Sequence, residues 1–139
     1  RLGLDVISTG QVIATAMEWY ERGIIDKEMT DGLELKFGNG DAVVEMVKKI
    51  AFREGFGDLL AEGSYKAALK IGRGALYYVM HVKGMELPAY DPRGAQGMGL
   101  VYATSNRGAC HLRAVSGGVQ GVRAITRDPC KHGRVHRDT

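Results

Sequence analysis

Apolar residues recur at every third or fourth position along three stretches in the first half of the chain. Such spacing places them on one side of a helix, which can then pack against a core. We therefore predict a helix over residues 6–21, stopped by Gly23, and a second over residues 41–55 with Asp41 as its N-cap. A third helix is expected over residues 58–72.

The second half of the chain has a shorter and more varied pattern. Residues 33–37 alternate apolar and charged side chains and residues 77–82 are rich in strand-forming types, so both segments are predicted to be briefly extended. Pro88 and Pro92 bracket a stiff, non-helical loop, and a helix is expected to restart after Gly94. The predicted fold class is all-α and multihelical, with one or two short extended segments.

The composition is that of an ordinary globular protein. The chain has 139 residues, enough for one domain, of which 45% are hydrophobic and 25% are charged. It contains no apolar run of the roughly 18 residues that a membrane-spanning helix needs, and no leader opens it, so we expect a cytoplasmic protein without a membrane partner. Two cysteines, Cys110 and Cys130, are too few for a disulfide framework or a four-ligand metal centre.

The net charge of +3 is unevenly distributed. Residues 113–139 hold six arginines and lysines against two aspartates, a net +4, which leaves −1 for the first 112 residues. The periodic pattern ends near Arg113, so we divide the chain into a helical domain, residues 1–114, and a basic, irregular tail, residues 115–139. The near-neutral body argues against a nucleic-acid partner. The basic tail nevertheless leaves one alternative function, a helical interaction module whose tail binds nucleic acid.

Polar groups able to carry chemistry gather between Tyr90 and Arg113. His111 can move a proton near neutral pH and the Tyr90 hydroxyl can donate to a polarised carbonyl oxygen, whereas a lone histidine is more often structural. The guanidinium groups of Arg107 and Arg113 suit phosphate oxygens or, alternatively, surface ion pairs. At the other end of the chain, Asp5 is placed to cap the first helix and to face a polar ligand.

Six motifs occur in an order that is more specific than any one of them. They are RLGLDVISTG (1–10), DGLELKFGN (31–39), REGFGDLLAEG (53–63), HVKG (81–84), PAYDPRG (88–94) and YATSNRGACHLR (102–113). Together they resemble the aldehyde ferredoxin oxidoreductase family. The resemblance implies oxidation of aldehydes to carboxylic acids, a tungsten bis-pterin cofactor (tungstopterin) or its molybdenum counterpart, and a 4Fe-4S cluster that passes electrons to ferredoxin. It also implies a helical region above a β-rich cofactor-binding domain.

The resemblance further implies roles for particular residues. Gly3, Leu4 and Asp5 are similar to the end of a pterin-binding motif, Asp-x-x-Gly-Leu-Asp, and Arg113 is similar to a basic position that contacts a pterin. His111 resembles a histidine beside the metal, suited to proton transfer or to holding the aldehyde oxygen. Tyr90 resembles a tyrosine that faces the substrate. No residue of this chain is expected to bind the metal itself.

The chain also departs from the family pattern. The closely spaced cysteines that hold the cluster are absent, and Cys130 does not sit in the downstream cluster motif, so the cluster ligands are expected outside this chain. We therefore expect a fragment of a larger enzyme that is inactive alone. Its expected partners are the remainder of the same polypeptide, ferredoxin and an aldehyde substrate, and homo-oligomerisation is left open.

Overall fold

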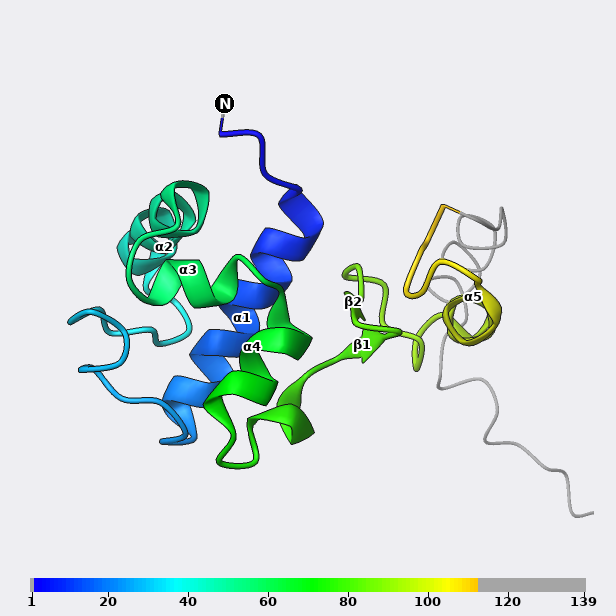
Figure 1. The fold of residues 1–139 in the computed structure, drawn as a ribbon. Helices are drawn as coiled ribbons and strands as arrows, with labels where there is room; N and C mark the ends of the chain where they lie inside the picture. Colours follow the sequence, from blue (N-terminus) through cyan, green and yellow to red (C-terminus); the bar gives the residue numbers. More distant parts are fainter. Residues whose placement is uncertain (1, 113–139) are drawn as a thin grey trace, which may run out of the picture.

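The computed structural model describes residues 2–112, and its ribbon is drawn in Figure 1. Within this part the elements are, in chain order, α1 (Val6–Glu21), α2 (Gly40–Phe52), α3 (Phe56–Leu60), α4 (Ser64–Ile71), the 3-10 helix η1 (Ala75–Tyr78), β1 (His81–Val82), β2 (Met85–Glu86) and α5 (Gln96–Thr104). The predicted all-α class is confirmed, because the only sheet in the described residues is one small antiparallel hairpin. No helix in residues 2–112 is both long and apolar enough to span a membrane.

Helix α1 lies at the centre of the helical body, with α2, α3 and α4 gathered around it (Figure 1). Its bounds are those predicted from the apolar spacing. Val12, Ala16 and Trp19 are fully or almost fully buried, so the predicted stripe faces the core. The Trp19 indole Nε1 donates a hydrogen bond to the Ala75 carbonyl oxygen at 2.9 Å. This bond ties the end of α1 to η1, fifty-six residues away along the chain.

The N-cap of helix α2 lies two residues before the predicted cap. Asn39, and not Asp41, is the N-cap, because its side-chain oxygen accepts the Ala42 N–H at 3.2 Å and its backbone is non-helical. Asp41 lies inside the first turn, where its negative charge interacts favourably with the positive end of the helix. The next helix, α3, packs closely on α2 at Gly57, where an added Cβ would lie 2.3 Å from the Lys49 carbonyl carbon.

The prediction of one helix over residues 58–72 is wrong, since two short helices occupy this region. The break falls at Gly63, whose φ of +90° no helix allows. The backbone N–H of Ser64 then donates to the Glu86 carboxylate at 2.8 Å, and its hydroxyl donates to the same oxygen at 3.0 Å. A side chain twenty-two residues away therefore caps α4, which local sequence patterns do not reveal.

The extended segments differ from the expectation. Residues 33–37 form no strand, because the chain turns there and the Lys36 N–H donates to the Glu34 carbonyl at 2.9 Å. In residues 77–82 the chain becomes extended only from Val79 onward, since η1 runs to Tyr78, and it pairs as a strand in β1. The loop between the two prolines is non-helical and α5 follows it, as predicted.

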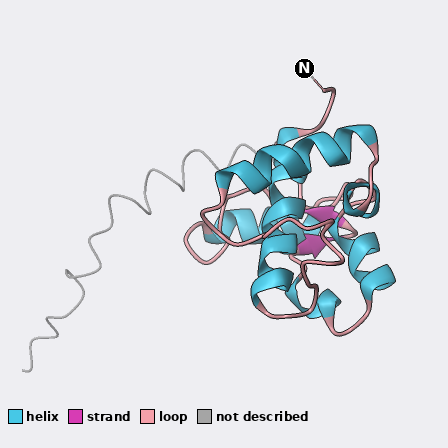
Figure 2. Cartoon of the chain, turned by 90° about the vertical axis from the view of Figure 1, so that its left-hand side faces the viewer, coloured by secondary structure: helices cyan, strands magenta, loops and turns pink. Residues whose placement is uncertain are grey.

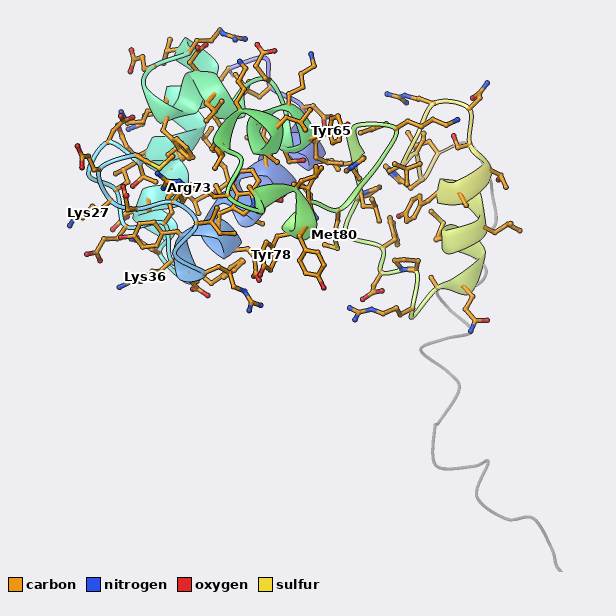
Figure 3. All side chains as sticks on the ribbon, turned by 60° about the horizontal axis from the view of Figure 1, so that its bottom comes forward. Lys27, Lys36, Tyr65, Arg73, Tyr78 and Met80 are labelled. Carbon is orange, nitrogen blue, oxygen red and sulfur yellow. The ribbon has the colours of Figure 1, made fainter. Side chains whose placement is uncertain are left out.

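The hairpin connects the helical body to α5. Figures 1 and 3 show it between these two parts, and Figure 2 shows its strands in magenta. In the hairpin, His81 pairs with Glu86 and Val82 with Met85. Because β2 also contacts α1, the hairpin fixes how the segment beyond it lies against the beginning of the chain.

Candidate functional site

A cavity of about 330 Å³ lies where the beginning of α1, strand β2 and the turn after α5 meet. Three segments that are far apart in the sequence therefore share one space. Apolar walls come from Ile7, Met85, Pro88, Ala109 and Leu112. The polar lining groups belong to Asp5, Ser8, Glu86, Arg107 and His111, with Cys110 among them. A volume of this size is at the lower end of the usual range for small-molecule sites.

Asp5 presents one oxygen to the protein and leaves the other available. As the N-cap of α1, it accepts the Ser8 backbone N–H through Oδ2 at 2.7 Å. Its Oδ1 accepts no hydrogen bond from residues 2–112. The side chain is exposed and lines the cavity, and it lies at the N-terminal end of a sixteen-residue helix. The aspartate can therefore cap the helix and accept a bond from a ligand at the same time.

His111 and Tyr90 lie against each other. Their ring centroids are 5.7 Å apart and the rings are inclined by 31°. Neither ring nitrogen of His111 has a hydrogen-bond partner among the described residues, so both are available to a molecule in the cavity. The carbonyl oxygen of Tyr90 accepts a hydrogen bond from the Tyr102 hydroxyl at 3.2 Å, which anchors the loop to α5. Burial, aided by the nearby Tyr90, raises the pKa of Tyr102, so this hydroxyl remains a donor.

The same loop is stiffened by a local ion pair. The Arg93 guanidinium donates to both oxygens of Asp91, at 2.6 Å to Oδ2 and 3.0 Å to Oδ1, and the Arg93 backbone N–H adds a bond to Oδ1 at 2.8 Å. These side-chain bonds first, and the backbone bond second, lower the pKa of Asp91 to about 2. The loop that carries Tyr90 is thus held closed next to the prolines that bracket it.

The turn that carries His111 is fixed against the hairpin. Gly108 has a φ of +118°, and an added Cβ would lie 2.6 Å from the Val82 carbonyl oxygen, so the two backbones touch. The Lys83 ammonium reaches across and donates to the Ser105 carbonyl at 3.0 Å. Within the turn, the Arg107 guanidinium approaches the sulfur of buried Cys110 at 3.6 Å. These contacts position the imidazole relative to β2 and the beginning of α1.

The structure brings together three of the six candidate site residues. Asp5 and His111 line the one cavity, and Tyr90 contacts the His111 ring. Gly3 and Leu4 line a neighbouring pocket, and Arg113 lies outside the described residues.

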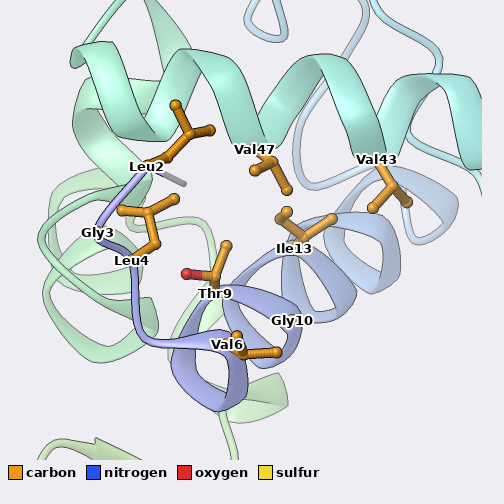
Figure 4. Close-up of a pocket in the computed structure, with 9 residues that line it drawn as sticks. All are labelled: Leu2, Gly3, Leu4, Val6, Thr9, Gly10, Ile13, Val43 and Val47. Atoms are coloured by element: carbon orange, nitrogen blue, oxygen red, sulfur yellow. The ribbon is translucent and has the colours of Figure 1, made fainter.

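That neighbouring pocket has a different character. It has a volume of about 610 Å³ and lies between the beginning of the chain, α1 and α2 (Figure 4). Leu2, Leu4, Ile13, Val43 and Val47 give it an almost wholly apolar lining. It therefore offers hydrophobic surface and few hydrogen-bond partners, unlike the cavity of Asp5 and His111.

Two charged residues of the cavity lie outside the candidate set. Arg107 was weighed as a phosphate ligand or a surface ion pair, and it supplies the cavity with a guanidinium. Glu86 is only 6% exposed and no sequence motif of the candidate site includes it. The available signal was its place in Val-Lys-Gly-Met-Glu-Leu-Pro, where one acid follows a turn and stands between apolar residues. An acid in that setting is buried on one face of a short strand and needs partners.

Comparison with known proteins adds the family context. A family model described as aldehyde ferredoxin oxidoreductase, domains 2 and 3, matches residues 1–136, and so extends past the 1–114 region of the motifs. The chain is 57% identical over 114 residues to the tungsten-containing aldehyde ferredoxin oxidoreductase of Pyrococcus furiosus, which covers 81% of this chain and 18% of that protein. The corresponding protein of Pyrococcus horikoshii is 54% identical, with 80% and 18% covered.

A solved structure shares the fold as well. It is the active-site complex BamBC of benzoyl coenzyme A reductase bound to 1,5-dienoyl-CoA, at a TM-score of 0.60 and 36% identity, covering 76% of this chain and 16% of that one. The chain thus spans about a fifth of the length of the curated relatives it matches.

Proposed function

The chain belongs to the aldehyde ferredoxin oxidoreductase family, and on this basis we propose that it forms part of an enzyme that oxidises aldehydes to carboxylic acids. The observation that carries the proposal is the single cavity lined by both Asp5 and His111, with Tyr90 against the imidazole. In the overall reaction the aldehyde gains one oxygen atom from water and releases two electrons and two protons. The site must therefore hold a carbonyl oxygen, move protons and face an electron acceptor.

His111 and Tyr90 supply the first two of these needs. With both ring nitrogens unpaired in the described residues, the imidazole can donate to the aldehyde oxygen from one nitrogen or accept a proton at the other. The Tyr90 hydroxyl is a second donor, on a side chain that is 50% exposed and contacts the His111 ring. A positioned donor of this kind acts more strongly where water is excluded. We assign proton transfer to His111 and orientation of the aldehyde to Tyr90.

The residues around the cavity also fit a pterin. A pterin ring carries N–H donors, for which the unpaired Asp5 oxygen is an acceptor, and the Arg107 guanidinium suits anionic groups attached to such a ring. Gly3, Leu4 and Arg113 are proposed as further contacts of the same cofactor. When bound, a tungsten–pterin centre would supply the acceptor for the two electrons.

The iron–sulfur cluster needs ligands from elsewhere. Residues 2–112 contain a single cysteine, Cys110, and no group of three metal-binding side chains. A 4Fe-4S cluster takes four thiolates, so this part of the chain does not hold one. We propose that the rest of a longer polypeptide supplies the cluster ligands, and that ferredoxin in the cytoplasm receives the electrons.

The proposal is tested in the full-length enzyme by aldehyde-dependent reduction of a viologen dye. Replacing His111 by alanine is expected to lower kcat by about 100-fold or more, which is the usual contribution of a general acid or base. Tyr90→Phe is expected to lower kcat/KM by about tenfold, the effect of one lost hydrogen bond. Tyr77→Phe is the matched control, since Tyr77 is 87% exposed and does not line the cavity. If the His111 and Tyr90 variants both retain activity within twofold of the control, the assignment fails.

We also propose that residues 1–139 alone are inactive, because the described part lacks cluster ligands. The purified 139-residue chain, supplied with tungstate and an aldehyde, should reduce no viologen. Turnover in that assay would contradict this proposal.

A further inference from the structure

Glu86 is a carboxylate buried in the wall of the candidate cavity. It lies on β2 and is 6% exposed, and it lines the same cavity as Asp5 and His111. No lysine, arginine or histidine of residues 2–112 forms an ion pair with it. Burying a carboxylate is costly unless its oxygens accept hydrogen bonds, so the partners of each oxygen decide what this side chain does.

One oxygen is fully occupied by the protein. Oε1 accepts the backbone N–H of Ser64 at 2.8 Å and the Ser64 hydroxyl at 3.0 Å. The preceding Gly63 leaves room for it, since a Cβ there would lie 3.0 Å from Oε1. The carboxylate thus caps the eight-residue helix α4, whose positive end partly offsets its charge. Its orientation is therefore fixed from one side.

The other oxygen has no partner in the protein. No residue of 2–112 donates to Glu86 Oε2. In that range, Ser105 Oγ is the only fully buried side-chain oxygen or nitrogen without a partner, so Oε2 is not fully buried. Oε2 therefore keeps contact with open space, and the space that Glu86 lines is the cavity. Together with the unpaired oxygen of Asp5, this makes two hydrogen-bond acceptors around one small cavity.

We propose that Glu86 is a further ligand-binding residue of this site, whose Oε2 accepts a hydrogen bond from an N–H or O–H donor of the molecule in the cavity. The identity of that molecule, a pterin or a hydrated aldehyde, rests on the proposed function. The backbone N–H of Ser64 aims the carboxylate, and Oε2 binds the molecule in the cavity. The division of labour between the two oxygens separates this role from a purely structural one.

Glu86→Gln in the full-length enzyme tests the proposal. Because the Ser64 backbone N–H can only donate, the amide oxygen of Gln must face it, and the NH₂ group then faces the cavity in place of Oε2. The cap of α4 is retained while the acceptor becomes a donor. Ser64→Ala is the matched structural control, since it removes only the hydroxyl bond to Oε1, keeps the backbone N–H bond that aims the carboxylate, and leaves Oε2 in place. Glu62→Gln controls for loss of a carboxylate away from the cavity.

Two quantities are measured on folded, purified protein: pterin and tungsten content per chain, and KM for acetaldehyde. We expect Glu86→Gln to change one of them by about 10- to 100-fold, the range for a lost hydrogen bond to a charged group, with both controls within twofold of the parent. A fall in pterin content identifies the pterin as the donor. A rise in KM at full pterin content identifies the aldehyde or its hydrate.

Three results would overturn the proposal. The first is unchanged pterin content and KM in Glu86→Gln. The second is an equal change in pterin content or KM in Ser64→Ala, and the third is failure of Glu86→Gln to fold. The last two would assign the residue to the helix cap alone. Failure of the proposed function is distinguishable from these. A parent enzyme that contains pterin and oxidises no aldehyde would end the aldehyde assignment, while the comparison of pterin content would still decide the role of Glu86.

Discussion

The contact between Gly108 and the hairpin gives the sharpest test of how the site is positioned. Replacing Gly108 by alanine adds one methyl group where the turn carrying His111 meets β1. That Cβ would lie 2.6 Å from the Val82 carbonyl oxygen and 3.2 Å from the Met85 Cβ. The first neighbour is backbone and cannot rotate away, so the turn and the hairpin must separate by roughly 0.8 Å to reach the 3.4 Å of an ordinary contact.

The expected cost has two parts. A non-glycine residue at positive φ costs about 1–2 kcal/mol, and forcing an extra carbon into a packed contact costs about 1–3 kcal/mol, so the sum is about 2–5 kcal/mol. His111 lies three residues beyond Gly108 and moves with the turn. Since a misplacement of about 1 Å can lower a rate on the order of 100-fold, a displacement of this size should lower kcat by about 10- to 100-fold.

The assay compares Gly108→Ala with Gly38→Ala in the full-length enzyme. Gly38 also has a positive φ, +90°, but an added Cβ there meets no atom within 4 Å, so this variant carries the backbone cost without the clash. Viologen reduction reports the rate, and amide hydrogen exchange over residues 105–112 reports local opening. We expect faster exchange and a lower rate for Gly108→Ala only. Equal behaviour of the two variants would refute the steric argument and the positioning role of this contact.

Two further predictions concern stability, measured by thermal unfolding. Gly57→Ala should destabilise the protein by about 3 kcal/mol or more, because its Cβ would lie 2.3 Å from the backbone of α2. Gly10→Ala, in α1 with no atom within 4 Å of the added Cβ, should stabilise it by about 0.5–1 kcal/mol. A change of the same sign in both variants would contradict this packing. The pKa of Asp31 is lowered chiefly by the Phe56 backbone N–H and further by Lys49. Its stabilisation should therefore be complete above about pH 4 and lost as the pH falls through the lower folded-state pKa, and Asp31→Asn should show a smaller loss over that window.

The sequence predicted those features that depend on neighbours along the chain. The bounds of α1 follow from its apolar spacing, and the loop before α5 follows from the two prolines. The errors arose where distant residues decide. A helix over residues 58–72 satisfies the local pattern, but α3 ends at Leu60, Gly63 has a positive φ, and the Glu86 carboxylate accepts from Ser64 at the start of α4. The brief extended segment expected at residues 33–37 is interrupted by a turn at Lys36, and no second strand lies beside it in the described residues.

The candidate site shows the same division. Asp5 was predicted correctly as a helix cap from its position before an apolar run, and the structure confirms the bond to Ser8. Its nearness to His111, 106 positions later, could be inferred only from family resemblance. In the structure that nearness depends on the hairpin, because β2 contacts α1 while the His111 turn packs on β1 through Gly108.

Glu86 could not be assigned to the site from the local sequence, because its partners lie far away along the chain. Local propensity places an acid poorly in a short strand between methionine and leucine, and such conflicts between local preference and fold concentrate at functional sites. Glu86 anchors the hairpin to α4 through one oxygen and opens the other to the cavity. Glu86 thus joins α4 to the hairpin on which the positions of Asp5 and His111 depend, and it lines the cavity that those two residues share.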